Sequence, residues 1–163
     1  RRVSENDSFD ISVIPYMVLI RMRAIRTILD TNVVFAGLYS NRGASYQVLR
    51  ALYAGRIEPV LSVALLFEYE DVLKRHSRKL GLNHKDIDSF LDVFCHFSYF
   101  QNVSFLWRPV LPDPKDDHVL ELAVASQVST ITTFNTRDFV GSQRFGVKTI
   151  GPQKLLEEIK WEL

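Results

Sequence analysis

Short apolar segments alternate along this chain with longer segments in which apolar residues recur every three or four positions. The first short segment, residues 27–29, stops at the polar sequence Asp30-Thr31-Asn32. Residues 59–62 repeat this pattern and lead directly into a helical pattern at 63–76. Strands that alternate with helices form parallel sheets covered on both faces. The alternation therefore predicts an α/β fold, a three-layer α/β/α sandwich around a central, mostly parallel sheet.

The same periodicities indicate about five strands. Ser62 and Asn83 are suitable N-caps for the helical patterns that follow them, and Gly55 is a suitable C-terminal signal. The expected strands are residues 27–29, 59–62, 103–107, 128–134 and 147–150. The expected helices are residues 44–54, 63–76, 84–99, 116–127 and a last helix that begins at Gly151-Pro152.

Residues 1–23 differ in composition from the rest of the chain. They combine acidic residues with an apolar run from Ile11 to Ile20 that basic residues follow. A run of about ten residues is too short to span a bilayer, which needs about 20, and the flanking residues do not resemble those of a signal peptide. The chain has 163 residues, enough for one domain. We therefore expect an N-terminal appendage at 1–23, partly disordered, and a single domain at 24–163.

Charge and cysteine content exclude several classes of protein. The chain has 20 Lys and Arg residues and 19 Asp and Glu residues, so a net charge of +1 provides no global attraction to nucleic acid or to lipid. A single cysteine, Cys95, forms no internal disulfide and no thiolate zinc site, which favours a cytoplasmic location. The chain contains no P-loop, dinucleotide fingerprint or nucleophile elbow.

Acidic and amide side chains follow several of the predicted strands. Asp30 and Asn32 follow the first strand, and Asn135 and Asp138 follow the strand at 128–134. Further carboxylates precede or lie on helices: Asp113, Asp116, Asp117 and either Glu68 or Glu70. Ligands of open parallel sheets bind beyond the carboxyl ends of the strands, and carboxylates gathered there repel each other unless a cation compensates them. The pattern predicts a site for Mg²⁺ or Mn²⁺.

Each of these residues also has a structural interpretation. Asp30, Asn135 and Asp138 are common turn residues, and Asp113 and Asp116 are favoured near a helix N-terminus by the helix dipole. Asp117 abuts the apolar stretch of its helix, which favours a functional role over a solvated one. Glu68 and Glu70 border the apolar face of their helix on opposite sides, so helix geometry does not choose between them.

Four segments in this order and spacing resemble the PIN domain, a fold of many metal-dependent ribonucleases. The resemblance covers residues 26–160. Its main pieces are ILDTNV at 28–33, S-x-x-L-x-x-E-Y-x-x-V-L at 62–73, DPKDD at 113–117 running into LELA at 120–123, and TFNTRDF at 133–139.

The resemblance implies a set of site residues. The first three acids of the family match Asp30, Glu68 and Asp117, which decides between Glu68 and Glu70. Many members have Asp where this chain has Asn135, and Asp138 is the nearby carboxylate that substitutes for it. The implied catalytic and metal-binding residues are Asp30, Glu68, Asp117 and Asp138, supported by Asn32, Asp116, Asn135 and Arg137.

The resemblance further implies a divalent-metal-dependent endoribonuclease that uses Mg²⁺ or Mn²⁺ to hydrolyse RNA. Its toxin-like subgroup implies the toxin of a toxin–antitoxin pair, with an antitoxin partner and a homodimer. No membrane association is expected, because the apolar run at 11–20 is too short to span a bilayer. The RNA backbone needs cations, for which the candidates are Arg42, Lys115, Arg137 and the basic residues at 74–79. Because Asn135 removes one charge, a catalytically weakened PIN module that binds RNA or protein is the alternative.

Other hydrolase and receiver folds match less well. A haloacid-dehalogenase-like phosphatase requires a second acid two residues after the first, where this chain has Asn32. A response-regulator receiver requires an acidic pair near the first strand and a Lys after a late strand, and the chain has no convincing equivalent.

Overall fold

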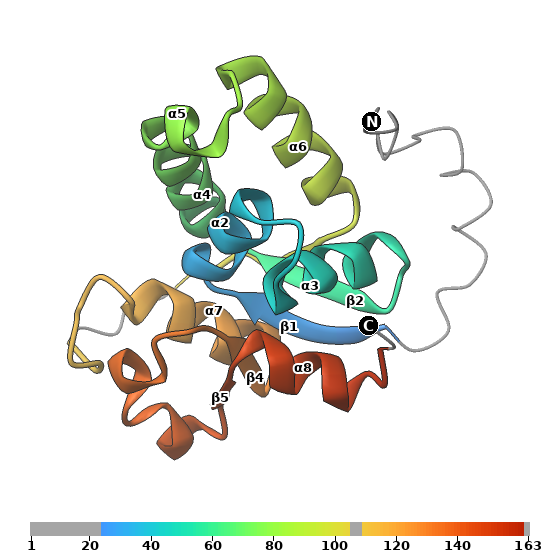
Figure 1. The fold of residues 1–163 in the computed structure, drawn as a ribbon. Helices are drawn as coiled ribbons and strands as arrows, with labels where there is room; N and C mark the ends of the chain where they lie inside the picture. The colour runs from blue at the N-terminus through green and yellow to red at the C-terminus, as the bar shows by residue number, and fades with distance from the viewer. Residues whose placement is uncertain (1–23, 105–108, 162–163) are drawn as a thin grey trace, which may run out of the picture.

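The computed structural model of the chain describes residues 24–104 and 109–161, and its centre is a five-stranded sheet (Figure 1). All pairs of neighbouring strands are parallel, and the order across the sheet is β3-β2-β1-β4-β5. The strands are β1 (Ile25–Leu29), β2 (Ile57–Leu61), β3 (Tyr99–Phe100), β4 (Thr130–Thr132) and β5 (Lys148–Ile150).

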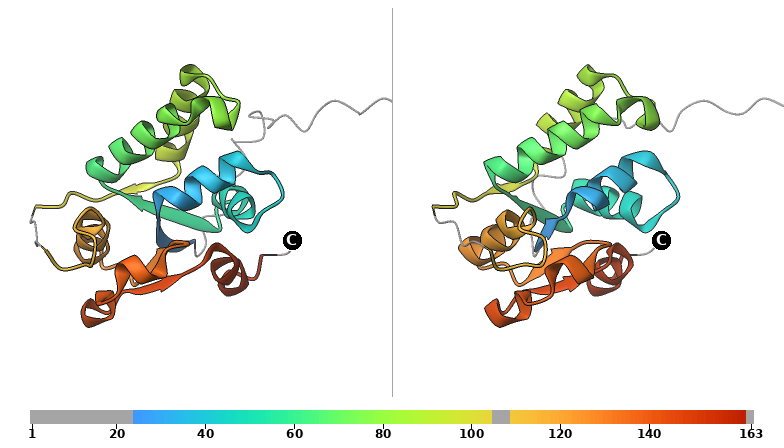
Figure 2. Two further views of the ribbon diagram at one scale, coloured as in Figure 1. Left: turned by 60° about the vertical axis from the view of Figure 1, so that its left-hand side comes forward. Right: turned by 90° about the vertical axis from the view of Figure 1, so that its left-hand side faces the viewer.

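Helices cover both faces of this sheet. Helix α7 lies on one side, and α2, α3 and α8 lie on the other (Figure 2). The helices are α2 (Thr31–Tyr39), α3 (Ala44–Tyr53), α4 (Val63–Arg75), α5 (Ser77–Leu80), α6 (His84–His96), α7 (Asp117–Ser126) and α8 (Pro152–Glu158), with 3₁₀ turns η3 (Thr136–Phe139) and η4 (Ser142–Phe145). The predicted three-layer α/β fold is confirmed, and the sheet is entirely parallel.

Local signals in the sequence define the starts of two long helices. Ser62 Oγ accepts a hydrogen bond of 3.2 Å from the backbone N–H of Leu65 and so caps α4. Asn83 and Asp86 form a reciprocal capping box at the start of α6. These bonds satisfy backbone donors that a helix N-terminus leaves unpaired, so both helices begin where the sequence predicts.

The core connects α4 to the end of β1. Tyr69 is fully buried in α4, and its hydroxyl donates a hydrogen bond to the carbonyl oxygen of Leu29, the last residue of β1. The ring of Tyr69 also packs edge-on against Phe94 of α6, with 5.7 Å between ring centroids. This contact fixes the position of the neighbouring Glu68 relative to the carboxyl end of β1.

The strand order reverses between β1 and β4. From β1 the chain proceeds outward through β2 and β3, then returns to place β4 on the other side of β1. Loops that leave two such strands diverge, and the crevice between them is the usual ligand site of an open parallel sheet. The fold therefore places the residues after Leu29 and after Thr132 on either side of one crevice.

The structure differs from the sequence-based prediction at residues 31–39, at 99–104 and at the end of the helix expected at 84–99, which stops at His96. The sequence 31–39 forms helix α2, for which no helix was expected. The strand expected at 103–107 lies instead at Tyr99–Phe100, where Val60 and Leu61 pair with it; residues 103–104 have no regular structure, and 105–107 lie outside the described residues. Pairing with β2 decides this position, since Gln101 N still donates to Leu61 O at 2.8 Å.

The appendage predicted at residues 1–23 lies outside the described part of the chain. Within the described part, no helix combines the length and the hydropathy needed to cross a membrane.

Candidate active site

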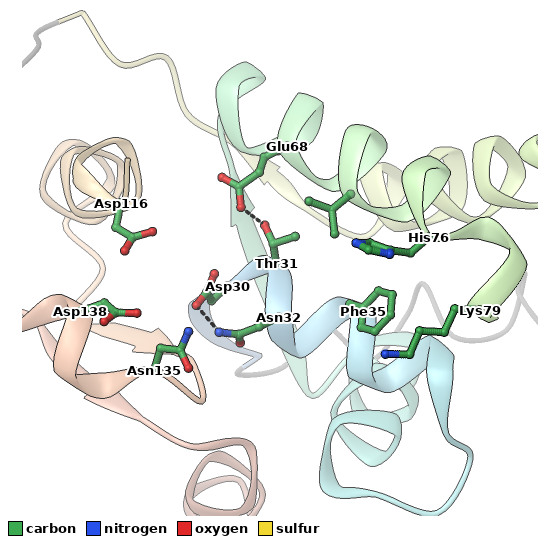
Figure 3. A pocket seen from close by; sticks show the side chains of 11 residues that line it. Asp30, Thr31, Asn32, Phe35, Glu68, His76, Lys79, Asp116, Asn135 and Asp138 are labelled. Atoms are coloured by element: carbon green, nitrogen blue, oxygen red, sulfur yellow. Dashed lines mark hydrogen bonds between the residues drawn. The ribbon is translucent and has the colours of Figure 1, made fainter. Parts of the chain in front are cut away.

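A cavity of about 400 Å³ opens at the carboxyl ends of β1 and β4, where the strand order reverses (Figure 3). Four carboxylates line one part of it, and an aromatic ring, an imidazole and an ammonium group line the other part. The carboxylates are Asp30, Glu68, Asp116 and Asp138, and the other groups are Phe35, His76 and Lys79.

Asp30 is the residue between β1 and α2, and only 9% of its surface is exposed. Its Oδ2 accepts hydrogen bonds from Asn32 Nδ2, at 2.7 Å, and from the hydroxyl of Thr133. Burial raises the pKa of Asp30, and the negative charge of Glu68 raises it further, although the hydrogen bond from Thr133 acts in the opposite direction. The carboxylate is thus held in a fixed position, and it has no ion pair with a cation within residues 24–104 and 109–161.

Asn32 connects the two strand ends that form the crevice. Its Nδ2 lies 3.2 Å from Thr133 Oγ1, and its Oδ1 accepts a hydrogen bond of 3.3 Å from Phe134 N. Both partners follow β4, so the side chain bridges from α2 to the loop beyond β4. The role that the sequence predicted for Asn32, a polar residue beside the site, agrees with this position.

Glu68 is held by two side chains from different helices. One carboxylate oxygen accepts a hydrogen bond from the hydroxyl of Thr31, and the other lies 2.9 Å from His118 Nε2. Burial acts to raise the pKa of Glu68, but the hydrogen bonds of His118 and Thr31 outweigh it and lower the pKa. Glu70 instead pairs with Lys74 at 2.6 Å and does not line the cavity, so the choice of Glu68 agrees with the geometry.

His118 is a residue of this site that the sequence did not indicate. Its Nδ1 lies 2.7 Å from the carbonyl oxygen of Lys115, while its Nε2 faces Glu68. Both imidazole nitrogens therefore face oxygen atoms, and proximity to acceptors favours the protonated form. Burial lowers the pKa of His118, but the hydrogen bond and charge of Glu68 outweigh burial and raise it. The two residues are far apart in sequence, and no spacing pattern connects them.

Asp116 and Asp117 exchange the positions expected for them. Asp117 is 1% exposed, and its carboxylate accepts hydrogen bonds from the backbone N–H groups of Val110, at 3.3 Å, and Leu111, at 2.9 Å. It anchors the loop that precedes α7 and does not line the cavity. Asp116 lines the cavity instead, because consecutive residues at a helix start point about 100° apart.

Asp138 and Asn135 complete the acidic part of the cavity from the loop after β4. Asp138 N donates a hydrogen bond of 3.1 Å to Asn135 O at the start of η3, and both side chains line the cavity. Burial raises the pKa of Asp116 to about 6, and the charges of Asp30, Asp113, Asp138 and Glu68 add to this effect. Negative charge is therefore concentrated in the acidic part of the cavity.

The predicted substrate-binding cations are only partly at the cavity. Lys74 is paired with Glu70 and Asp88, and Arg75 is paired with Asp71. Arg137 lines a smaller neighbouring pocket and not the cavity. Arg42 and Lys115 do not line the cavity either. His76 and Lys79 are the members of this set that line it.

Carboxylate oxygens line the cavity, but those of the described residues do not form a complete set of ligands around one position. Over residues 24–104 and 109–161, no three His, Cys, Asp or Glu side chains lie close enough together to be recognised as the ligands of one ion. Carboxylate oxygens suit Mg²⁺ and Mn²⁺, and Mg²⁺ keeps several of its waters when it binds to protein. The donor set therefore fits a hydrated divalent ion.

Comparison with known families agrees with the fold. A sequence profile of the PIN domain matches residues 26–137, a range that includes Asp30, Glu68 and Asp116. The comparison with curated proteins gave no match. Because the profile covers more than half of the chain, the protein belongs to the PIN-domain family.

Proposed function

We propose that the protein is a divalent-metal-dependent endoribonuclease that hydrolyses phosphodiester bonds in RNA. PIN domains are generally nucleases. The observation that carries the proposal is the cluster of four carboxylates in one cavity, in which burial and neighbouring negative charge raise the pKa of Asp116 to about 6. A divalent cation would remove this repulsion.

Asp30, Glu68, Asp116 and Asp138 are the residues that would hold Mg²⁺ or Mn²⁺. When bound, the ion supplies a water of lowered pKa as nucleophile and neutralises charge on the scissile phosphate. This assignment replaces Asp117, whose carboxylate is occupied by the backbone of Val110 and Leu111.

The remaining polar residues orient these carboxylates. Asn32 and Thr133 fix the carboxylate of Asp30, while Thr31 and His118 fix that of Glu68. Side chains that are oriented before the ligand arrives lose less freedom on binding, and such partners typically contribute 10- to 100-fold in metal affinity or activity. Asn32 and His118 are therefore positioning residues.

A catalytically weakened module that binds RNA or protein is the second candidate. One observation favours it: Asn135 lines the cavity without a charge. In this case the cavity would bind its partner without cleaving it.

The toxin role rests on the resemblance of the sequence to toxin-like PIN proteins. It includes an antitoxin partner, a homodimer and a cytoplasmic location. Induced expression in a bacterial host should arrest growth, and the Asp30→Asn variant should not. Growth that continues at equal protein levels would contradict the toxin role but not the ribonuclease.

The ribonuclease is tested by incubating purified protein with a mixed RNA panel in Mg²⁺, Mn²⁺ or EDTA. We expect cleavage that requires metal and that falls more than 100-fold in Asp30→Asn and in Asp116→Asn. Asp92→Asn, an exposed carboxylate on α6, is the matched control and should cleave as the wild type does. Folded protein that cleaves no RNA with either metal would refute the proposal and favour the binding module.

Asp117→Asn distinguishes the two interpretations of the acidic pair. It weakens the contacts that hold Val110 and Leu111, so we expect it to lower the melting temperature, with activity that follows the folded fraction. A folded Asp117→Asn variant without activity, beside an active Asp116→Asn variant, would return the metal-binding role to Asp117.

A further inference from the structure

The part of the cavity opposite the acids has a different chemistry. Figure 3 shows Phe35, His76 and Lys79 on the far side of Asp30 from Asp116 and Asp138. Phe35 belongs to α2, while His76 and Lys79 lie at the end of α4 and on α5. This part of the cavity therefore presents an aromatic ring, an imidazole and an ammonium group within one open space.

The aromatic surface extends out of the cavity along α2. The rings of Phe35 and Tyr39, one helical turn apart, are stacked with their centroids 6.0 Å apart and their planes 10° apart. The ring of His76 meets Phe35 edge-on at 5.6 Å. Tyr39 is 55% exposed, so part of this aromatic surface faces solvent.

Lys79 supplies a positive charge at this surface. Its Nζ lies 5.1 Å from the ring centroid of Tyr39 and 5.5 Å from that of Phe35. No ion pair of Lys79 occurs among the residues that the structure describes, whereas Lys74 and Arg75 of the same basic run are paired with carboxylates. The charge of Lys79 is thus available to an anion.

Aromatic faces beside an unpaired cation have the chemistry of a single-stranded nucleic-acid site. Bases stack on aromatic side chains, and cations beside the stack contact the phosphates. A base within a duplex is not available for stacking, because its neighbours already cover both faces. Without a bound cation, the acidic part of the cavity repels the phosphates of a nucleic acid. Lys79 attracts them on the opposite side of the cavity.

We propose that Phe35, Tyr39 and Lys79 bind an unpaired nucleotide of single-stranded RNA next to the acidic cluster, with its base against the rings and its phosphate at the ammonium group. This inference rests on the proposed function and assigns residues that position its RNA substrate. Tyr39 and Lys79 are substrate-positioning residues in this arrangement, and the strand extends from them toward Asp30.

Binding is measured separately from cleavage, in an Asp30→Asn background with Mg²⁺. The probe is a fluorescein-labelled single-stranded RNA of ten nucleotides, followed by fluorescence anisotropy. Tyr39→Ala should raise the Kd about 5- to 150-fold, because one stacked base is lost, while Tyr39→Phe should stay close to the background. Phe67→Ala, which removes another exposed ring on α4 that does not line the cavity, is the matched control.

Lys79 is tested by the dependence of binding on salt. One lost phosphate contact should reduce the slope of log K against log salt concentration by about 0.7 for single-stranded RNA. Lys79→Ala should show this change, Lys79→Arg should not, and Lys85→Ala on the exposed surface of α6 is the control. A structural role of Lys79 would leave the slope unchanged.

Two further probes identify what the rings bind. A strand of the same length without bases should bind Tyr39→Ala and its background equally, and a duplex of the same sequence should bind more weakly than the single strand. Equal Kd values for single strand and duplex, or no effect of either Tyr39→Ala or Lys79→Ala, would overturn the inference. Binding through Tyr39 by a protein that cleaves no RNA would refute the ribonuclease alone.

Discussion

Replacement of Asp116 by Asn should stabilise the metal-free protein at neutral pH. The pKa of Asp116 rises from 3.8 to about 6 in the folded chain, because burial and neighbouring carboxylates disfavour its charge. A shift of about two units corresponds to about 3 kcal/mol of folding free energy. Screening by water reduces this value, and the lost favourable interaction with the N-terminus of α7 removes about 0.3 to 1 kcal/mol more. A gain of about 1 to 2 kcal/mol remains.

The pH dependence identifies the cause of this gain. In the window between the two pKa values, 3.8 and about 6, the folded protein binds more protons at Asp116 than the unfolded chain does. The protonated carboxyl of Asp116 therefore contributes to the stability of the folded state at low pH, and this contribution is lost as the pH rises through this window. The advantage of Asp116→Asn should be small below pH 4, grow up to about pH 6 and stay constant above it.

The assay is urea unfolding at a series of pH values in EDTA, followed by circular dichroism, with Asp92→Asn as the control. In Mg²⁺ the order should reverse, because the wild type then gains binding free energy that the variant lacks. An Asp116→Asn variant that is less stable than the wild type at pH 7 in EDTA would refute the argument that uncompensated charge accumulates in the cavity.

Three further predictions concern residues that hold the site in place. Tyr69→Phe leaves the buried carbonyl of Leu29 without its hydrogen bond and should lower the free energy of unfolding by about 1 to 3 kcal/mol in urea titrations; an unchanged midpoint would show that this bond is not needed. Gly37→Ala places a Cβ 2.7 Å from Leu49 Cδ1 and 2.9 Å from Ser45 O, so it should cost about 1 to 3 kcal/mol, whereas Gly43→Ala, with nothing within 4 Å, should be close to neutral. His118, whose pKa is raised by Glu68 against the effect of burial, should stabilise the protein fully below pH 6.5 and progressively less as the pH rises through its folded pKa; a stability difference between wild type and His118→Gln that is constant from pH 5.5 to 8.5 would contradict this.

The fold was largely predictable because hydrophobic periodicity and caps act locally. Ser62 and Asn83 begin their helices where the sequence indicates. Helix α2 was missed because Thr31–Tyr39 combines adjacent Val33 and Val34 with apolar residues on several sides, so neither a helical stripe nor a strand alternation stands out. The position of β3 depends on pairing with β2, and pairing between distant segments leaves little trace in the sequence.

The candidate site was predictable at the ends of strands and less so at the start of a helix. Asp30, Asn32, Asn135 and Asp138 line the cavity because parallel strands end at the same edge of the sheet. The choice between Asp116 and Asp117 depends on the loop that packs beneath α7, which the sequence does not specify.

The reversal of strand order also affects when during synthesis the cavity can exist. Its carboxylates come from segments as distant as Asp30 and Asp138, and the pairing of β4 with β1 brings Asp138 to the crevice. A chain emerges from the ribosome with its N-terminus first. A nascent chain that ends before β4 therefore carries Asp30 and Glu68 but not Asp138, so the complete cavity forms only when translation is nearly finished. Two fragments divided in the connection before α7 would each lack the site and would regain it only on association.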